Sequence, residues 1–408
     1  MRLIPAGIDL TALRNPAFRM IALAQLGFVV GEQVLAVAVT VSVLSAGGDA
    51  ATVGVVLAAK GVASLCLLLV GGVWSDRLSR RRILTVMLAV DAAAASVPIV
   101  VGGHTAAVWL PATVLFVVGA AEAFIRPAFN AILAGSLDED RRMSGRALVN
   151  ICTRVGVITG PVVGTLLAGG SRVLPFALAA LVFAAAALAL RGVVEPSWTP
   201  VARRSLLKEA TAGFAEAGRR PWLTALLLFS PVSLMFVIAP SQVLLPVLSR
   251  DMFGSYTAYG TALACYGAGG LIGSVTMMAW RPRRSGVVAM CAMSLYALVP
   301  LGLLYAPSIW VLFCCYLIAG FGVETYALCW DVAMYREVPD HLIGRITSLA
   351  WLATFGLMPF GQAVTGPLTN LTGDQAVLLG AAGLVLVIPP CLLLVPGMTH
   401  LRGTRTPG

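Results

Sequence analysis

The chain has 408 residues, of which 59% are hydrophobic and 11% charged; its formal net charge is +10 and its mean hydropathy is +0.92. Soluble domains carry about 25% charged residues, so this composition excludes an ordinary soluble protein and predicts a membrane protein with many spans. A basic chain can bind nucleic acid, but here the positive charges lie in short segments between apolar runs, where they orient the spans. We therefore expect a lipid bilayer, and no nucleic acid, as the partner.

Apolar runs recur along the whole chain, each near the length of about 20 residues that crosses a bilayer as a helix. With both termini in the cytoplasm, nearly all arginines outside these runs fall on the inner side, and Arg172 and Arg250 are the exceptions. The sequence therefore predicts an all-α fold of twelve transmembrane helices in two six-helix bundles, with both termini cytoplasmic. The predicted helices cover residues 17–46, 51–73, 82–102, 107–134, 146–169, 172–192, 221–248, 255–280, 286–305, 308–335, 344–369 and 375–397.

The two halves of the chain resemble each other. Arg14-Asn15-Pro16 before the first span recurs as Arg219-Arg220-Pro221 before the seventh, and Gly145-Arg146 before the fifth recurs as Gly344-Arg345 before the eleventh. Two parallel repeats of this kind are typical of transporters whose substrate site lies near the membrane midplane between the halves.

The longest connection joins the two halves. It carries Leu206, Leu207 and Phe214 at helical spacing, with basic residues interleaved, which predicts an amphipathic helix on the inner membrane surface. A plain linker without a partner is the alternative. The expected domains are an N-terminal bundle (1–195), this linker (196–218) and a C-terminal bundle (219–408).

The cysteine and histidine residues indicate neither a metal site nor a disulfide framework. All eight cysteines lie in apolar runs, and no Cys-x-x-Cys pair occurs. No zinc, serine-nucleophile or cysteine–histidine signature suggests an enzyme. ATP is excluded as the energy source because a P-loop needs Gly-Lys-Ser/Thr, and the only lysines, Lys60 and Lys208, stand in other contexts. We expect no cofactor, no metal and no enzymatic activity, and transport driven by an ion gradient.

The stretch from Gly71 to Arg82 reads Gly-Gly-Val-Trp-Ser-Asp-Arg-Leu-Ser-Arg-Arg-Arg and joins two apolar runs. Arginines at this density cannot cross a bilayer, which places the connection in the cytoplasm. The pattern resembles the signature between the second and third spans of the major facilitator superfamily, although Ser79 stands where that family usually has glycine. The resemblance implies a cytoplasmic gate, to which we add an aspartate from the third span and one from the tenth. The predicted gate residues are Gly72, Asp76, Arg77, Arg80, Arg81, Asp91 and Asp331.

Placing an ionisable residue inside a span costs roughly 2.5–3.5 kcal/mol on insertion scales, so each such residue is expected to have a structural or functional role. Glu32 and Lys60 sit on adjacent antiparallel helices, within reach of an ion pair. Glu122 and Arg126 are four residues apart on one helical face, acid before base. Such pairs either neutralise charge and hold helices together, or let a carboxylate exchange protons in a low-dielectric cavity. We predict Glu32 as the first proton-coupling residue and Glu122 as the second; the predicted charge partners are Lys60, Arg126 and Arg154.

The fifth span carries a strip of small residues, Gly156, Gly160 and Gly164, together with Pro161. Glycine at every fourth position gives a flat face for close helix packing, and the proline permits a bend. The strip resembles a motif of antiporters in the major facilitator superfamily, with Thr165 in place of the last glycine, and it favours export.

The resemblance narrows to the macrolide-efflux type of bacterial drug–proton antiporter. It rests on Leu13–Arg19, Gly31-Glu32, Val70–Trp74, Phe124-x-x-Pro127 and Trp330-Asp331. Relatives of this type usually have aspartate where this chain has Glu32. They also carry a third-span aspartate about one turn nearer the loop than Asp91, which leaves the role of Asp91 open between a gate contact and proton transfer.

Five further residues are predicted at the depth of the substrate cavity, where they would suit a bulky amphipathic compound. They are Phe28, Tyr266, Glu324, Tyr326 and Trp351. The favoured function is a monomeric, proton-coupled exporter of small amphipathic or hydrophobic compounds, such as antibiotics, in the bacterial inner membrane. A metabolite importer or symporter of the same fold is the alternative, and a membrane-embedded enzyme or structural protein is the third hypothesis.

Overall fold

The computed structural model describes residues 14–102, 108–137, 139–193, 218–280, 282–339, 342–343, 346–347, 350, 356–399 and 401. Within these ranges every regular element is helical, as the composition predicts. Ten described segments are long and apolar enough to cross a membrane, and a shorter apolar helix covers Leu174–Leu190. The predicted linker helix and Trp351 lie outside the described residues.

The chain divides into two compact units, one of Met1–Gly48 with Ala59–Ala202 and the other of Asp49–Ala58 with Arg203–Gly408. The described residues between 14 and 193 fold into six helices. They are α1 (Pro16–Ser45), α2 (Ala50–Arg77), α3 (Arg80–Val100), α4 (Trp109–Gly135), α5 (Glu139–Gly170) and α6 (Leu174–Leu190).

Polar residues just outside the apolar runs set where the first helices begin. The side-chain oxygen of Asn15 accepts a hydrogen bond from the backbone N–H of Ala17 at 3.0 Å and caps α1. Asp49 does the same for α2 by accepting a hydrogen bond from the N–H of Thr52 at 2.9 Å. Each cap satisfies an N–H that has no partner within its own helix.

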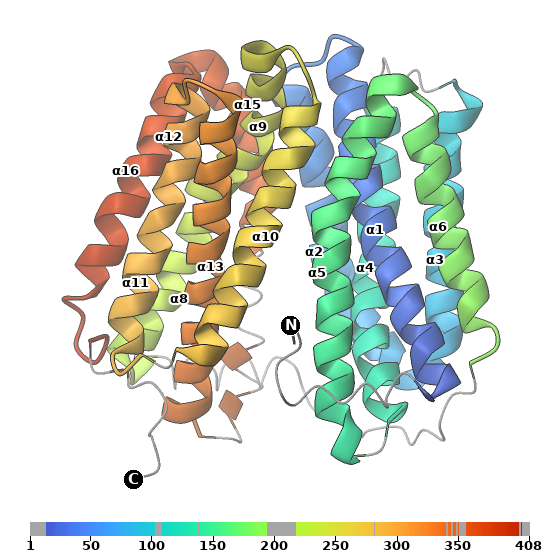
Figure 1. The fold of residues 1–408 in the computed structure, drawn as a ribbon, viewed down its shortest axis with the longest axis horizontal. Coiled ribbons are helices and arrows are strands. Elements are labelled where there is room, and N and C mark those ends of the chain that lie inside the picture. Colours follow the sequence, from blue (N-terminus) through green and yellow to red (C-terminus); the bar gives the residue numbers. More distant parts are fainter. Residues whose placement is uncertain are drawn as a thin grey trace, which may run out of the picture. The chain divides into compact units, whose positions relative to one another are not determined.

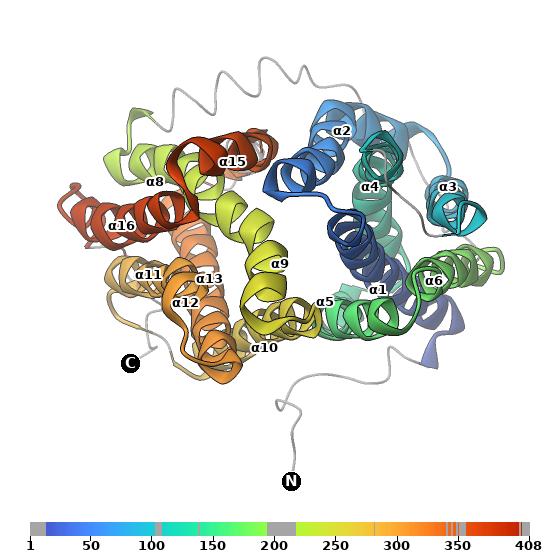
Figure 2. The same ribbon diagram turned by 90° about the horizontal axis from the view of Figure 1, so that it is seen from above.

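The most enclosed helices of the first unit are α1 and α4. α1 packs against α4, α5 and α6, and α3 packs against α4 and α6 (Figure 2). The most apolar stretches of α1 and α4 are each 67% buried, against 28% for that of α5. Neighbouring helices therefore enclose much of α1 and α4, and the charged residues described below come from these two helices and their neighbours.

The second unit contains longer helices interrupted near prolines. The predicted span 221–248 extends to Phe253, and its widened π-helical turn ends two residues before Pro240. Pro240 lacks the N–H that would bond back to Phe236, so an α-helical hydrogen bond is missing there. The elements are α8 (Pro221–Ser233), η2 (Leu234–Ile238), α9 (Ala239–Phe253), α10 (Thr257–Ala279), α11 (Ser285–Ser294), η3 (Leu295–Ala297), α12 (Leu298–Tyr305), α13 (Ile309–Glu337), α15 (Met358–Thr372) and α16 (Asp374–Leu392).

α10 and α13 lie side by side in this unit (Figure 1). A Cβ atom at Gly269 would collide with the carbonyl oxygen of Leu317, and one at Gly320 would collide with that of Tyr266. Glycine at these two positions therefore allows the two backbones to approach closely.

Residues 393–399 and 401, here called the C-terminal tail, fold back onto the second unit. The N–H and the hydroxyl of Ser285 both donate to the carbonyl oxygen of Leu401, at 3.0 and 2.9 Å. Met398 and Leu401 are buried in a hydrophobic cluster with Trp222 and Met290. The tail thereby connects the ends of α8 and α11.

Candidate functional site

The connection between α2 and α3 is shorter than the sequence predicts. α2 extends to Arg77 and α3 begins at Arg80, so only Leu78 and Ser79 join them. The hydroxyl of Ser79 accepts a hydrogen bond from the N–H of Arg82 at 3.3 Å and caps α3. Hydropathy marks where a bilayer ends and not where a helix ends, which explains why most of the predicted loop lies on the two helix ends.

Two arginines of this signature bind backbone carbonyls near helix C-termini. Arg80 donates to the carbonyl oxygen of Ala131 in α4 at 3.3 Å. Arg81 donates to the carbonyl oxygens of Arg191 and Val193, just after α6, at 3.1 and 3.2 Å. Cations at such positions satisfy free carbonyls and complement the helix dipole, so these arginines tie α3 to α4 and α6.

Three further residues of the predicted gate, Gly72, Asp76 and Arg77, belong to α2. The side chains of Asp76 and Arg77 are outside the described part of the chain. A Cβ atom at Gly72 would meet nothing within 4 Å, whereas one at Gly71 would collide with the backbone of Ala123. Of the two glycines, Gly71 is the one that the α2–α4 contact requires.

Four charged side chains from three helices form one network, here called the charge cluster: Glu32 of α1, Lys60 of α2, and Glu122 and Arg126 of α4. Lys60 forms an ion pair with Glu32 and a second one, at 3.2 Å, with Glu122. Arg126 forms an ion pair with Glu122 and a longer one, at 3.5 Å, with Glu32. Each acid therefore touches both bases, and the two ion pairs that the sequence predicts separately are joined.

The acids of the charge cluster are more enclosed than the bases. The side chains of Glu32 and Glu122 are 7% and 11% exposed, whereas that of Arg126 is 55% exposed. Two acids and two bases balance in charge, as buried ions must if the helices are to stay together. Because the two acids share both bases, protonating either acid would leave Lys60 and Arg126 paired with a single carboxylate.

Asp91, which the sequence places among the predicted gate residues, interacts with the charge cluster in the structure. It stands in the middle of α3, and it interacts electrostatically with Glu32, Lys60 and Glu122. Its side chain is fully buried, and neither carboxyl oxygen has a hydrogen-bond partner among the described residues. Spacing alone could not show this, because the sequence does not give the rotation of α3 against α1 and α2.

The glycine strip of α5 packs on α1. Cβ atoms built at Gly156, Gly160 and Gly164 would meet the side chains of Val29, Gln33 and Val37 in turn. The contacts repeat every four residues on both helices, so the strip of small residues forms a continuous α1–α5 seam around Pro161. Arg154, the third predicted charge partner, is half-buried on the same helix. The ion pairs described above for Glu32 and Glu122 are formed with Lys60 and Arg126.

The predicted cavity residues lie in different surroundings. Phe28 is 1% exposed and packs between the rings of Phe129 and Phe183, at centroid distances of 6.1 and 6.5 Å, so it belongs to the packed interior of its unit and not to a cavity wall. In the second unit, Glu324 accepts a hydrogen bond from the hydroxyl of Ser274 at 2.9 Å.

Asp331, on the same helix as Glu324, is exposed and interacts with it electrostatically. Tyr266 packs edge-on against Tyr296 at 6.4 Å, and Tyr326 is half-buried against the hydrophobic cluster that holds the C-terminal tail. Glu324, Asp331, Tyr266 and Tyr326 all belong to the second unit, whereas the charge cluster belongs to the first.

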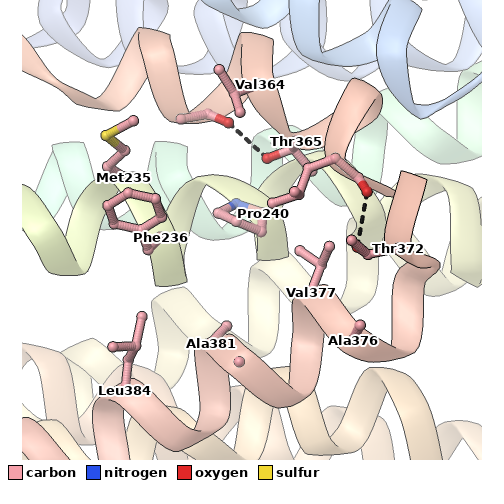
Figure 3. Close-up of a pocket in the computed structure, with 13 residues that line it drawn as sticks. Met235, Phe236, Pro240, Val364, Thr365, Thr372, Ala376, Val377, Ala381 and Leu384 are labelled. Carbon is pink, nitrogen blue, oxygen red and sulfur yellow. Dashed lines mark hydrogen bonds between the residues drawn. The ribbon is translucent and has the colours of Figure 1, made fainter. Parts of the chain in front are cut away.

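The second unit has two features that the sequence reasoning missed. The side-chain amide of Gln362 donates to that of Gln242 at 3.1 Å, a polar pair that amides inside two predicted spans could have indicated. A cavity of about 270 Å³ lies between η2, α9, α15 and α16 (Figure 3). Its lining is apolar apart from Thr365 and Thr372, whose hydroxyls bond to backbone carbonyls of their own helix. It suits an apolar group and offers no proton-exchanging side chain.

Apolar helices that enclose a balanced cluster of acidic and basic side chains are typical of polytopic transporters, because ionisable residues inside membrane spans usually serve a function. A family model described as Major Facilitator Superfamily matches residues 21–363, and the chain belongs to this superfamily.

Curated relatives support the same class. The chain is 27% identical over 405 residues to the multidrug efflux pump Tap of Mycobacterium tuberculosis (strain ATCC 25618 / H37Rv), a match that covers 93% of this chain and 94% of the pump. It is 24% identical over 408 residues to the enterobactin exporter EntS of Escherichia coli (strain K12 / MC4100 / BW2952), with 97% and 96% covered. Both relatives are efflux transporters, and the chain is accordingly a membrane transporter and not an enzyme.

Solved structures share the fold. The nucleoside transporter NupG superposes with a TM-score of 0.72 at 15% identity, covering 93% of this chain and 98% of that one. A bacterial homologue of the iron transporter ferroportin, in an inward-facing state, gives 0.69 at 14% identity, covering 94% and 98%. This likeness establishes the architecture and leaves the substrate to other arguments.

Proposed function

We propose that the chain is a proton-coupled secondary exporter of small amphipathic or hydrophobic compounds. The charge cluster carries this proposal: Glu32 and Glu122 are the candidate proton-exchanging groups, and Lys60 and Arg126 their charge partners. The efflux function of the relatives favours export, and so does the resemblance of the α5 strip to an antiporter motif. A metabolite importer or symporter remains the alternative and would require a denser polar substrate site.

The proposed architecture has twelve transmembrane helices, with both termini in the cytoplasm of a bacterium and the protein in its inner membrane as a monomer. Residues 1–195 and 219–408 form the two bundles, and residues 196–218 join them. In this orientation the α2–α3 turn faces the cytoplasm, and we assign Gly72, Asp76, Arg77, Arg80, Arg81 and Asp331 to the inner gate.

The proton acts by breaking the charge balance of the cluster. Protonating Glu32 removes one of the two acids that hold Lys60 and Arg126, which leaves excess positive charge in a largely enclosed site. Removing one partner of a buried ion pair typically costs about 3–5 kcal/mol, enough to favour a second conformation. Alternating access then follows from two conformations that differ in the protonation of Glu32, without ATP.

An efflux assay tests this function. The chain is expressed in an efflux-deficient bacterium and challenged with a panel of toxic amphipathic compounds, with and without a protonophore. We expect resistance to several compounds, lost with the protonophore and lost in Glu32→Gln, whereas Glu337→Gln, at the exposed end of α13, keeps it. Resistance that survives the protonophore would exclude proton coupling, and uptake in place of export would favour the importer.

A further inference from the structure

Asp91 has the most unusual surroundings of the acids in the first unit. Its side chain is fully buried and its two carboxyl oxygens accept no hydrogen bond within the described ranges. Glu32 and Glu122, in contrast, each touch two cations. A buried carboxylate without hydrogen bonds or a counter-ion is strongly unfavourable, so the neutral, protonated acid is the form that fits this position.

The charged groups around Asp91 come from three helices. Glu32 of α1, Lys60 of α2 and Glu122 of α4 interact with it electrostatically. α3 also packs against α6, which contains only apolar residues and contributes no charge. Lys60 is therefore the cation that Asp91 shares with both acids of the charge cluster.

Charge balance fixes how many protons the three acids hold between them. Glu32, Glu122, Lys60 and Arg126 sum to zero when all four are ionised. Ionising Asp91 as well would add one uncompensated negative charge to these five groups, which one proton on any of the three acids removes. Asp91, which accepts no hydrogen bond within the described ranges, is the acid that best fits the proton in this structure, and Glu32 is the proposed coupling acid that receives it.

We propose that Asp91 is a further proton-binding residue of the transport cycle, exchanging one proton with Glu32 while Lys60 moves between them. In one state Asp91 holds the proton and Lys60 pairs with Glu32, the ion pair that this structure contains. In the other Glu32 holds the proton, and the Lys60 ammonium pairs with the Asp91 carboxylate. One O–H bond breaks as another forms, so no further reactant is needed. This inference rests on the proposed proton coupling and adds Asp91 to its acids.

Asp91→Asn tests the exchange, because asparagine resembles the protonated acid in shape but cannot release a proton. The variant is reconstituted in proteoliposomes with a compound that the efflux panel identifies. We expect transport driven by a pH gradient to fall by about tenfold or more, while exchange of labelled for unlabelled compound without a gradient persists. Asp251→Asn, at an exposed aspartate of the second unit, is the matched control and should retain both activities.

The outcomes separate this inference from the proposed function. Gradient-driven transport that is unchanged in Asp91→Asn refutes the role of Asp91 and leaves proton coupling intact. No gradient-driven transport by the native chain refutes the proposed function itself. If Asp91→Asn does not fold, infrared spectra of the native protein with carboxyl-labelled aspartate decide the matter. A protonated aspartate band at neutral pH supports the inference, and its absence overturns it.

Discussion

Lys60 is the residue on which the charge cluster depends most, since it pairs with both acids from a separate helix. Replacing it by methionine keeps the apolar stem and removes the ammonium. Glu32 would then keep only its longer contact with Arg126, at 3.5 Å. We expect Lys60→Met to lower the free energy of unfolding by about 3–5 kcal/mol, as in other broken buried ion pairs. Thermal unfolding in detergent measures the loss.

A second substitution shows whether that loss is electrostatic. Adding Glu32→Gln to Lys60→Met removes the acid that the first change leaves poorly paired. The double variant should therefore be more stable than the sum of the two single losses predicts, by about 0.5–3 kcal/mol. Strict additivity would mean that Lys60 and Glu32 do not interact in the membrane protein.

Asp49 provides a residue-scale prediction outside the spans. Hydrogen bonds from the backbone N–H and the hydroxyl of Thr52 lower the pKa of this carboxyl, with burial opposing them. A folded-state pKa below the unfolded value, about 3.9, stabilises the fold above that value, and this gain is lost as the pH falls through the folded pKa. Asp49→Ala should therefore cost about 1 kcal/mol at neutral pH and progressively less below pH 4 or so.

Unfolding temperatures of the native chain and the variant, compared at several pH values, measure this effect. Asp49→Asn is the control, because asparagine still accepts the Thr52 hydrogen bonds but does not titrate between these pH values. A cost of Asp49→Ala that stays constant down to acidic pH would show that the ionised carboxylate contributes nothing to the cap.

At the scale of elements, the α1–α5 seam depends on the absence of side chains. A Cβ atom at Gly160 would lie 2.5 Å from the Cβ atom of Gln33, closer than packed carbons allow, whereas one at Gly169 would meet nothing within 4 Å. Overpacking of this kind typically costs about 1–3 kcal/mol. We expect Gly160→Ala to lower both thermal stability and efflux, and Gly169→Ala, on the same helix, to change neither. Equal effects of the two would mean that the seam tolerates extra volume.

The C-terminal tail is an element without regular secondary structure that nevertheless fills a core. Met398 is 0% exposed and Leu401 5% exposed, whereas Leu394 is 85% exposed. Truncating a buried methionine or leucine typically costs about 2–5 kcal/mol. Met398→Ala and Leu401→Ala should therefore lower the unfolding temperature, and Leu394→Ala should not. Limited proteolysis gives a second readout, since a released tail is cleaved first; a tail equally protected in all three variants would contradict this packing.

At the scale of the whole molecule, the sequence predicts well where the apolar helices lie. It predicts poorly how these helices rotate against one another. Apolar runs located α1 and α3 to within a few residues because hydropathy averages over a whole span. The same averaging missed the extension of α2 to Arg77 and the π-helical turn of Leu234–Ile238, which depend on single hydrogen bonds. Composition and apolar runs predicted the all-helical class, whereas they did not predict these local irregularities.

The candidate site shows the same limit. The Glu122–Arg126 pair is predictable because both residues share one helix, where spacing gives the geometry. The pairing of Lys60 with both acids, and the position of Asp91, depend on how separate helices rotate against one another, which one sequence does not specify. Phe28 was predicted at a cavity for the same reason, although its helix turns it toward Phe183.

Reversibility is the property of the whole transporter that tests proton coupling most directly. A secondary transporter catalyses an exchange, so its direction follows the gradients and not the protein. One pH unit is worth about 1.36 kcal/mol, which equals a tenfold concentration ratio for an exchange of one proton per compound. Proteoliposomes holding equal compound on both sides and acidified inside should therefore accumulate it up to about tenfold per pH unit, and expel it when the gradient is reversed. Glu32→Gln should leave the ratio at unity in both cases, because a glutamine carries no proton between the two sides. A native ratio that ignores the pH difference while labelled compound still exchanges would show a carrier whose cluster of charges is purely structural.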